Sequence, residues 1–212
     1  MQKINYQKQL DELLGQIKNS STRPKLLLHS CCAPCSSYVL EYLSRYFHII
    51  LFYYNPNISP KQEFEKRTSE LQRLVSEMPL PDKPEIIVGD YEPEEFYAIA
   101  KGFEELPEGG ERCFRCYRLR LEKAALLAKK LSADYFTTTL SISPYKNAQK
   151  LNEIASELGE IYSVKALPAD FKKREGYKRS IELSAQYDLY RQDYCGCIYS
   201  KAERDRKKNE TV

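Results

Sequence analysis

The sequence predicts an α/β protein whose parallel sheet is covered by helices on both faces. Two observations support this fold class. Short runs of apolar and β-branched residues recur along the 212-residue chain, and segments with helical periodicity or helix caps separate them. Strands that alternate with helices form right-handed βαβ units, and such sheets bind ligands beyond the carboxyl ends of their strands.

The first half of the chain contains three expected strands. Leucine and isoleucine side chains at helical spacing predict an initial helix over residues 5–18. Ser59 and Pro60 have the pattern of a helix N-cap followed by a first-turn proline. The other elements expected here are strands at 25–29, 48–54 and 85–89, and helices at 36–46, 59–78 and 93–101.

The same alternation continues in the second half. Ser143 and Pro144 predict the start of a helix that Gly159 can end. The elements expected here are a loop at 106–112, a helix at 113–131, a strand at 134–139, the helix from Ser143 to Gly159, a strand at 160–164 and a helix at 175–187.

The composition is that of one globular domain. Apolar residues make up 42% of the chain, so we expect a single domain over residues 1–212, with the helix at 5–18 and the basic tail 201–212 as appendages. The longest apolar run, residues 48–54, is far too short to span a bilayer, and the N-terminus lacks the apolar segment of a signal peptide. We therefore expect a cytoplasmic protein without a membrane partner.

The charge pattern gives a weak indication of a polyanionic partner. The net charge is only +3, but basic residues gather in the last fifth of the chain, at 172–174, 178–179 and in the tail KAERDRKKNE. A solvated helix face and a frayed terminus explain this equally well. Seventeen tyrosines add side chains of the kind that stack on nucleic-acid bases.

The cysteines are the clearest sign of chemistry. The chain has seven, and they form three tight groups: Cys31, Cys32 and Cys35; Cys113 and Cys116; Cys195 and Cys197. An odd number of cysteines argues against a complete disulfide framework. In a cytosolic protein, clustered thiols more often bind a metal or carry electrons.

Two of these groups suit a shared metal centre. Cys113 and Cys116 stand three residues apart at the start of a helix, so both sulfurs face one side, and neighbouring arginines favour thiolates. Cys31 and Cys32 follow a strand where a helix begins, at a positive helix terminus. Tetrahedral zinc fits four cysteines, but structural zinc usually uses two CxxC-type knuckles. The double cysteine therefore favours an iron–sulfur cluster over zinc.

Other interpretations of the thiols remain open. Cys32 and Cys35 form a C-x-P-C motif between a strand and a helix, which is typical of a thioredoxin-like thiol–disulfide oxidoreductase. A zinc-stabilised RNA-binding module is a further alternative. Cys195 and Cys197 flank Gly196 and can form only a small strained ring, and strained disulfides tend to be labile and catalytic. They can also be further metal ligands.

Three polar residues near the predicted edge are weaker candidates. Asn55 follows the second strand, and Ser143 and Lys146 resemble the start of a phosphate-binding helix. We expect these three to contact substrate. His29 adjoins the double cysteine, and a core position suits it somewhat better than a metal site. The first strand is followed by HSCCAPCSS, which has no glycine, so ATP-dependent activation is disfavoured.

Taken together, the motifs resemble those of one known family. HSCCAPCSS, YYNPNISPKQEFEKR, ERCFRCYRLRLEKAA, FTTTLSISPYKN, DFKKREGYKRS and YRQDYCGCIYS resemble the QueH-type epoxyqueuosine reductases over residues 25–200. The resemblance implies a Rossmann-like fold of the nucleotide-alpha-hydrolase (HUP-like) type. It also implies a cobalamin-independent oxidoreductase that converts epoxyqueuosine to queuosine at the wobble position of tRNA.

The resemblance also implies site residues. Cys31, Cys32, Cys113 and Cys116 would bind a [4Fe–4S] cluster. Cys195 and Cys197 would form a redox-active pair. Cys35 stands where relatives can carry aspartate and would bind an adjacent mononuclear iron or other metal. The partners implied are the anticodon stem-loop of tRNA and an electron donor that the sequence does not identify.

Overall fold

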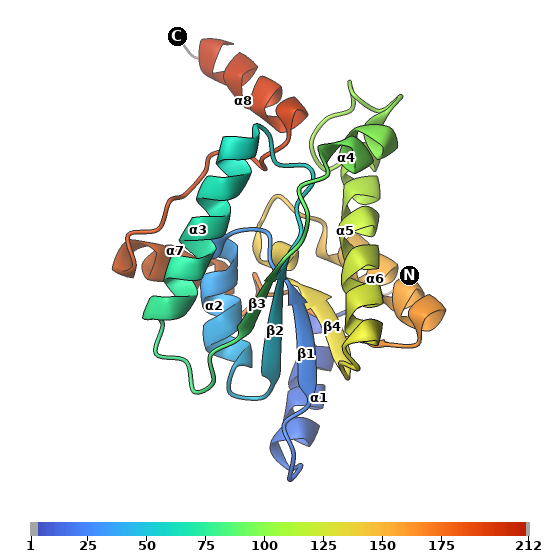
Figure 1. Cartoon of the computed structure of the whole chain (residues 1–212), viewed down its shortest axis with the longest axis vertical. Coiled ribbons are helices and arrows are strands. Elements are labelled where there is room, and N and C mark those ends of the chain that lie inside the picture. Colours follow the sequence, from blue (N-terminus) through green and yellow to red (C-terminus); the bar gives the residue numbers. More distant parts are fainter. Residues whose placement is uncertain (1–3, 211–212) are drawn as a thin grey trace.

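The computed structural model describes residues 4–210 and contains one five-stranded sheet (Figure 1). All strand pairs are parallel, and the strand order is β3-β2-β1-β4-β5. The strands are β1 (Lys25–His29), β2 (His48–Tyr53), β3 (Glu85–Val88), β4 (Tyr135–Thr138) and β5 (Lys165–Ala166). The predicted α/β class with a parallel sheet is confirmed.

Helices connect all of these strands. The described residues form α1 (Tyr6–Lys18), α2 (Ala33–Leu43), α3 (Lys61–Glu77), α4 (Pro93–Ala100), α5 (Glu111–Lys130), the short 3₁₀ helix η1 (Thr139–Ile142), α6 (Ala148–Tyr162), α7 (Gly176–Gln186) and α8 (Ile198–Glu210). Within residues 4–210, no helix has the length and apolar character needed to cross a membrane.

Helices cover the sheet on both faces, as the alternating side chains of β1 show. Leu26 and Leu28 pack into a core with residues of α1, α2 and α3. Leu27 points the other way, into a core with residues of α5 and α6. Figure 1 shows α2 and α3 on one side of the sheet and α5 and α6 on the other. This arrangement confirms the predicted cover on both faces.

Helix α1 contributes directly to the first core. Leu10 and Leu14 are fully or almost fully buried, and Asn5 caps the helix by accepting a hydrogen bond from the backbone N–H of Lys8 at 3.0 Å. The spacing of apolar residues therefore identified the buried face of this helix correctly.

Helix α2 begins three residues earlier than predicted, at Ala33 instead of Ser36. Pro34 lies in the first turn, where its fixed backbone angle suits a helix start and its missing N–H costs nothing. As a result Cys32 is the N-cap and Cys35 lies in the first turn.

The predicted boundaries around α6 were wrong at both ends. The helix begins at Ala148 after the cap Asn147, whose side chain accepts from the N–H of Lys150, and not at Ser143. It runs through Gly159 to Tyr162, so residues 160–162 are helical and the last strand is β5 at 165–166. A Cβ on Gly159 would lie 2.8 Å from the carbonyl oxygen of Val164. The glycine thus permits close packing of the chain and does not end the helix.

Candidate active site at the carboxyl edge of the sheet

A cavity of about 1080 Å³ opens at the carboxyl ends of β1 and β4. These two strands lie side by side at the point where the strand order reverses, which is where open parallel sheets bind ligands. Its lining includes the β1–α2 turn, residues 140–146, and residues 191–195 together with α8, which follows them almost directly in the chain. Asn55, Glu108 and residues of α5 and α7 complete the lining.

Three of the predicted thiols converge in this cavity. The sulfur atoms of Cys31, Cys32 and Cys35 all lie within 4.8 Å of one another, and those of Cys31 and Cys32 are 3.8 Å apart. The early start of α2 explains this, because a cap residue and a residue three positions later face the same side of the first turn. The group is a set of soft donors suited to iron–sulfur or zinc.

The three thiols share negative charge unequally. Hydrogen bonds from Cys31 and Cys35 hold the pKa of Cys32 well below its usual value. The same contact with Cys32 raises the pKa of Cys31 to about 12, and its two sulfur neighbours raise the pKa of Cys35. One thiolate at the helix N-terminus is therefore favoured over three. A bound cation would be required to ionise all three together.

Cys113 and Cys116 lie on the first turns of α5 and are not part of this 4.8 Å group. Both are largely buried, and burial raises the pKa of Cys113 and raises that of Cys116 to about 12. The backbone N–H of Gly109 donates to the Cys113 sulfur at 3.3 Å. Two arginines expected to favour thiolates here instead pair with glutamates, Arg115 with Glu111 and Arg118 with Glu157.

The two thiols that flank Gly196 have different surroundings. Cys195 lines the cavity, and the Lys146 ammonium lies 3.3 Å from its sulfur. Cys197 is buried in an apolar cluster with Phe96 and Cys116, and burial raises its pKa. All seven cysteines are free thiols in the structure. The pair thus combines one thiol open to the cavity with one enclosed beside the CxxC helix.

Gly196 has the backbone conformation that the sequence argument required. Its φ is +118°, and a Cβ would lie 2.9 Å from Ile58 and 3.0 Å from the Arg67 guanidinium. Arg67 also donates to the Cys195 carbonyl at 3.2 Å. We expect Gly196→Ala to lower the free energy of unfolding by about 1–3 kcal/mol. Alanine disfavours this positive φ, and its methyl group would lie too close to Ile58 and Arg67.

Denaturant unfolding tests this expectation, with Gly15→Ala as the matched control. Gly15 lies within α1, and nothing is within 4 Å of its Cβ position. There alanine should stabilise the helix by about 0.5–1 kcal/mol. Equal stability of the two variants would contradict the strain assigned to Gly196.

The predicted substrate contacts all lie at the cavity, and each already has protein partners. Asn55 is fully buried, donates to the Ser30 carbonyl at 2.9 Å and accepts from Arg120 at 3.2 Å. Lys146 is buried and 2.5 Å from Glu108. Ser143 accepts from the Tyr145 N–H at 3.3 Å. Direct contact of these residues with a substrate stays a prediction.

His29 has a structural role. It is fully buried, and burial followed by the nearby charge of Arg120 lowers its pKa to about 3, so the ring is neutral. Its Nε2 lies 3.0 Å from the Tyr54 carbonyl and its Nδ1 lies 2.8 Å from the Thr138 hydroxyl. The neutral ring satisfies both contacts when Nε2 donates and Nδ1 accepts. These bonds join β1 to its two neighbouring strands.

Two buried arginines beside the cysteine groups could not be predicted from the sequence pattern. Arg120 and Arg67 are each only 2% exposed and lie beside the cysteine groups. Arginine is rarely buried, so a sequence pattern assigns such residues to the surface. One signal was available for Arg120, which follows Cys116 by four positions and therefore shares its helix face.

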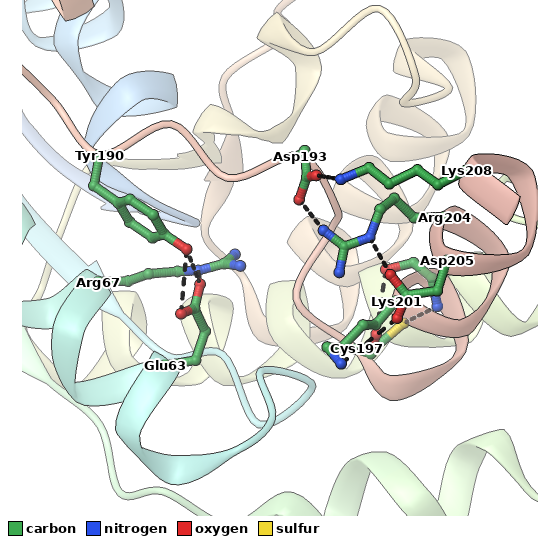
Figure 2. A network of polar contacts seen from close by, with 10 residues as sticks. Glu63, Arg67, Tyr190, Asp193, Cys197, Lys201, Arg204, Asp205 and Lys208 are labelled. Atoms are coloured by element: carbon green, nitrogen blue, oxygen red, sulfur yellow. Dashed lines mark hydrogen bonds and ion pairs between the residues drawn. The ribbon is translucent and has the colours of Figure 1, made fainter. Parts of the chain in front are cut away.

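Basic side chains from α8 form one rim of the cavity. Figure 2 shows Asp193 bound by both Arg204 and Lys208, the latter at 2.7 Å. The centre of the Tyr194 ring lies 5.3 Å from the Arg67 guanidinium carbon and 5.0 Å from that of Arg204. The segment before Cys195 is thus fixed to α8 on one side and to α3 on the other.

Comparisons with known proteins agree on one family. The family model described as "Epoxyqueuosine reductase QueH" matches residues 26–203. Proteins named epoxyqueuosine reductase QueH include one from Streptococcus pyogenes serotype M1, 43% identical over 201 residues, covering 94% of this chain and 79% of that protein. The protein of that name from Staphylococcus epidermidis is 45% identical over 203 residues, covering 94% and 85%. The one from Thermotoga maritima is 36% identical over 191 residues, covering 87% and 94%.

A solved structure shares the fold. The U34-tRNA thiolase NcsA from Methanococcus maripaludis, with its [4Fe-4S] cluster, superposes with a TM-score of 0.52 and 12% identity, over 96% of this chain and 74% of that chain. At this identity the likeness concerns the fold alone, and it agrees with the Rossmann-like, HUP-like class expected from the sequence. The family model and the curated relatives reach further than this structural likeness, and by them the chain belongs to the epoxyqueuosine reductase QueH family.

Proposed function

We propose that this oxidoreductase converts epoxyqueuosine to queuosine at the wobble position of tRNA, the last step of queuosine biosynthesis. The observation that carries the proposal is the match to the QueH family over residues 26–203. The convergence of three thiols within 4.8 Å beside a large cavity supports it, because the reaction needs a reducing centre that a modified base can reach.

Cys31, Cys32, Cys113 and Cys116 are the proposed ligands of a [4Fe–4S] cluster, which when bound would supply electrons and an iron able to polarise the epoxide oxygen. The donors fit this group, because all four are thiols and the hydrogen bonds of Asn55 and Arg120 connect the backbone beside Cys31 to that of Cys116. Cys35 lies within 4.8 Å of the double cysteine. It is the proposed ligand of a second, adjacent metal, a mononuclear iron or another ion.

Removing the epoxide oxygen as water and leaving an alkene consumes two electrons and two protons. Oxidation of the Cys195 and Cys197 thiols to one disulfide releases that number of each, so the overall reaction balances. Lys146 would stabilise the negative charge on the cavity-facing sulfur of Cys195, 3.3 Å away. An external electron donor then restores the two thiols.

The basic rim is the proposed contact for the anticodon stem-loop. Phosphate contacts supply affinity and make it dependent on salt, while tyrosine side chains at the rim can stack on an unpaired base. Tyr145 is 76% exposed there. This placement extends the contact into residues 204–210, beyond the part of the chain matched by the family model.

Lys208→Gln should weaken tRNA binding and lower the slope of log affinity against log salt by about 1, because one phosphate contact is lost. The matched control is Lys201→Gln, which removes the same charge from α8 at a residue outside the cavity wall. Binding measured across a salt series checks the prediction. Identical slopes for both variants would show that Lys208 does not contact the tRNA phosphates.

The function itself is tested with tRNA that carries epoxyqueuosine. The protein is purified without oxygen and incubated with this tRNA and a chemical reductant, and the digested nucleosides are separated by mass. We expect queuosine to replace epoxyqueuosine over many turnovers. A protein loaded with iron and sulfide that converts none of the substrate would refute the proposal.

A further inference from the structure

A chain of buried hydrogen bonds connects the double-cysteine turn to the CxxC helix. Asn55 donates to the carbonyl of Ser30, the residue before Cys31, at 2.9 Å. Arg120 donates through one terminal nitrogen to the Asn55 amide oxygen at 3.2 Å and through Nε to the Cys116 carbonyl at 3.3 Å. These links join β1 to α5 at the level of the cysteines.

The positive charge of Arg120 is not balanced by these two acceptors, because both are neutral oxygens. Its side chain is buried and lines the cavity, and its second terminal nitrogen, Nη2, has no hydrogen-bond partner in the described structure. Its recorded acceptors in residues 4–210 are an amide oxygen and a carbonyl oxygen. Burying a cation without a counter-charge costs several kcal/mol. A nearby anion must therefore offset the charge of Arg120.

The cysteines would supply that anion when they bind the proposed cluster as thiolates. Burial lowers the pKa of Arg120, but the charges of Cys116, Cys195 and Cys31 outweigh burial and leave it raised. Arg67 provides a contrast within the same site. It is equally buried, but it has a carboxylate partner, because its Nε donates to Glu63 at 2.8 Å. The charge of Cys32 also acts on Arg67, whereas Arg120 has no carboxylate partner among the described residues and depends on the sulfur groups.

We infer that Arg120 is a positioning residue of the sulfur centre, which holds the double-cysteine turn against the CxxC helix and places an unpaired N–H group and a buried positive charge at the cavity that Cys31, Cys32 and Cys195 line. The inference rests on the proposed cluster and goes beyond it by separating two effects. The hydrogen bonds to Asn55 and Cys116 set how firmly the centre is held. The charge sets how easily it accepts an electron.

Three variants separate these effects in the cluster-bearing protein. Arg120→Met removes both the charge and the bonds. Arg120→Lys keeps the charge but loses the planar fork that bonds Asn55 and Cys116 together. Asn55→Ala keeps the arginine and breaks the bond to Ser30. Arg118→Met is the matched control, since Arg118 lies on the same helix in an exposed ion pair with Glu157.

There are two readouts. The first is the reduction potential of the cluster, measured from its electron spin resonance signal. The second is the rate at which iron is released to a chelator. Arg120→Met should make reduction at least about tenfold less favourable, which is about 59 mV for one electron. Arg120→Lys and Asn55→Ala should stay near the wild-type potential but release iron about tenfold faster. Arg118→Met should match the wild type in both readouts.

Wild-type potential and iron release in Arg120→Met would overturn the inference. If that variant does not fold, the other two decide, and unchanged iron release in both would overturn it equally. A colourless wild-type protein without iron would refute the proposed cofactor and this inference together. A coloured wild type with unchanged variants would refute this inference alone.

Discussion

Cys32→Ser should abolish iron–sulfur binding and lower epoxyqueuosine reduction by more than about 10³-fold, as expected when a reaction loses a group on which it depends. Cys32 caps α2, and among the three clustered thiols it alone has a pKa held below its usual value. Its thiolate is the first ligand ready for a metal. A serine hydroxyl in the same place stays protonated and is a poor donor to iron–sulfur centres.

The measurement compares anaerobically purified variant and wild-type protein by visible absorbance, iron and sulfide content, and turnover. Circular dichroism shows whether the variant is folded, which is expected because serine is close to cysteine in size. A folded Cys32→Ser protein with normal iron content and turnover would exclude Cys32 as a ligand.

Cys197→Ser should also lower turnover by more than about 10³-fold but, unlike Cys32→Ser, should leave the cluster absorbance intact. In the proposed reaction Cys197 forms a disulfide with Cys195, and serine cannot. Cys197 is buried in an apolar cluster with Phe96 and Cys116, so a change there places a hydroxyl next to the CxxC helix without removing a proposed ligand.

Absorbance and multiple-turnover kinetics measured together distinguish the two roles considered for this thiol. Loss of both absorbance and turnover would indicate that Cys197 is a metal ligand. Retained multiple turnover would contradict its role in the redox pair.

The sheet and its two cores were predictable because each central strand is a short, almost continuous apolar run. The misplaced last strand has a local cause. Glycine is common just after the end of a helix, but in the structure Gly159 lies within α6 and allows it to pack against the carbonyl of Val164. The helix ends instead at Tyr162, and its C-cap Ser163 has a φ of +57°. Periodicity cannot distinguish a glycine that ends a helix from one that permits close packing.

The cysteine groups were visible in the sequence, but their geometry was not. The close approach of Cys35 to the double cysteine depends on α2 starting at Ala33, which is a boundary of the kind that sequence patterns place least well. Lys146 and Cys195 meet across 49 positions of chain. Arg120 connects the CxxC helix to the double-cysteine turn through Asn55. Only the folded chain shows that Arg120 and Asn55 are buried.

The C-terminal tail shows the limit of a charge pattern. Residues 201–210 belong to α8, which begins at Ile198, and Arg204 and Lys208 from this helix line the cavity. The sequence allowed a frayed terminus or a basic binding element equally. Ion pairs to Asp193, on the segment before Cys195, fix the helix beside the site, and this contact had no counterpart in the sequence pattern.

Chemical analysis of the anaerobically purified chain for iron, acid-labile sulfide and zinc most directly tests whether its scattered thiols build one electron-carrying centre. We expect a brown protein with about four iron atoms and four sulfides in each chain, and additional iron where a second metal is bound. One zinc ion per chain, with neither iron nor sulfide, would contradict the account.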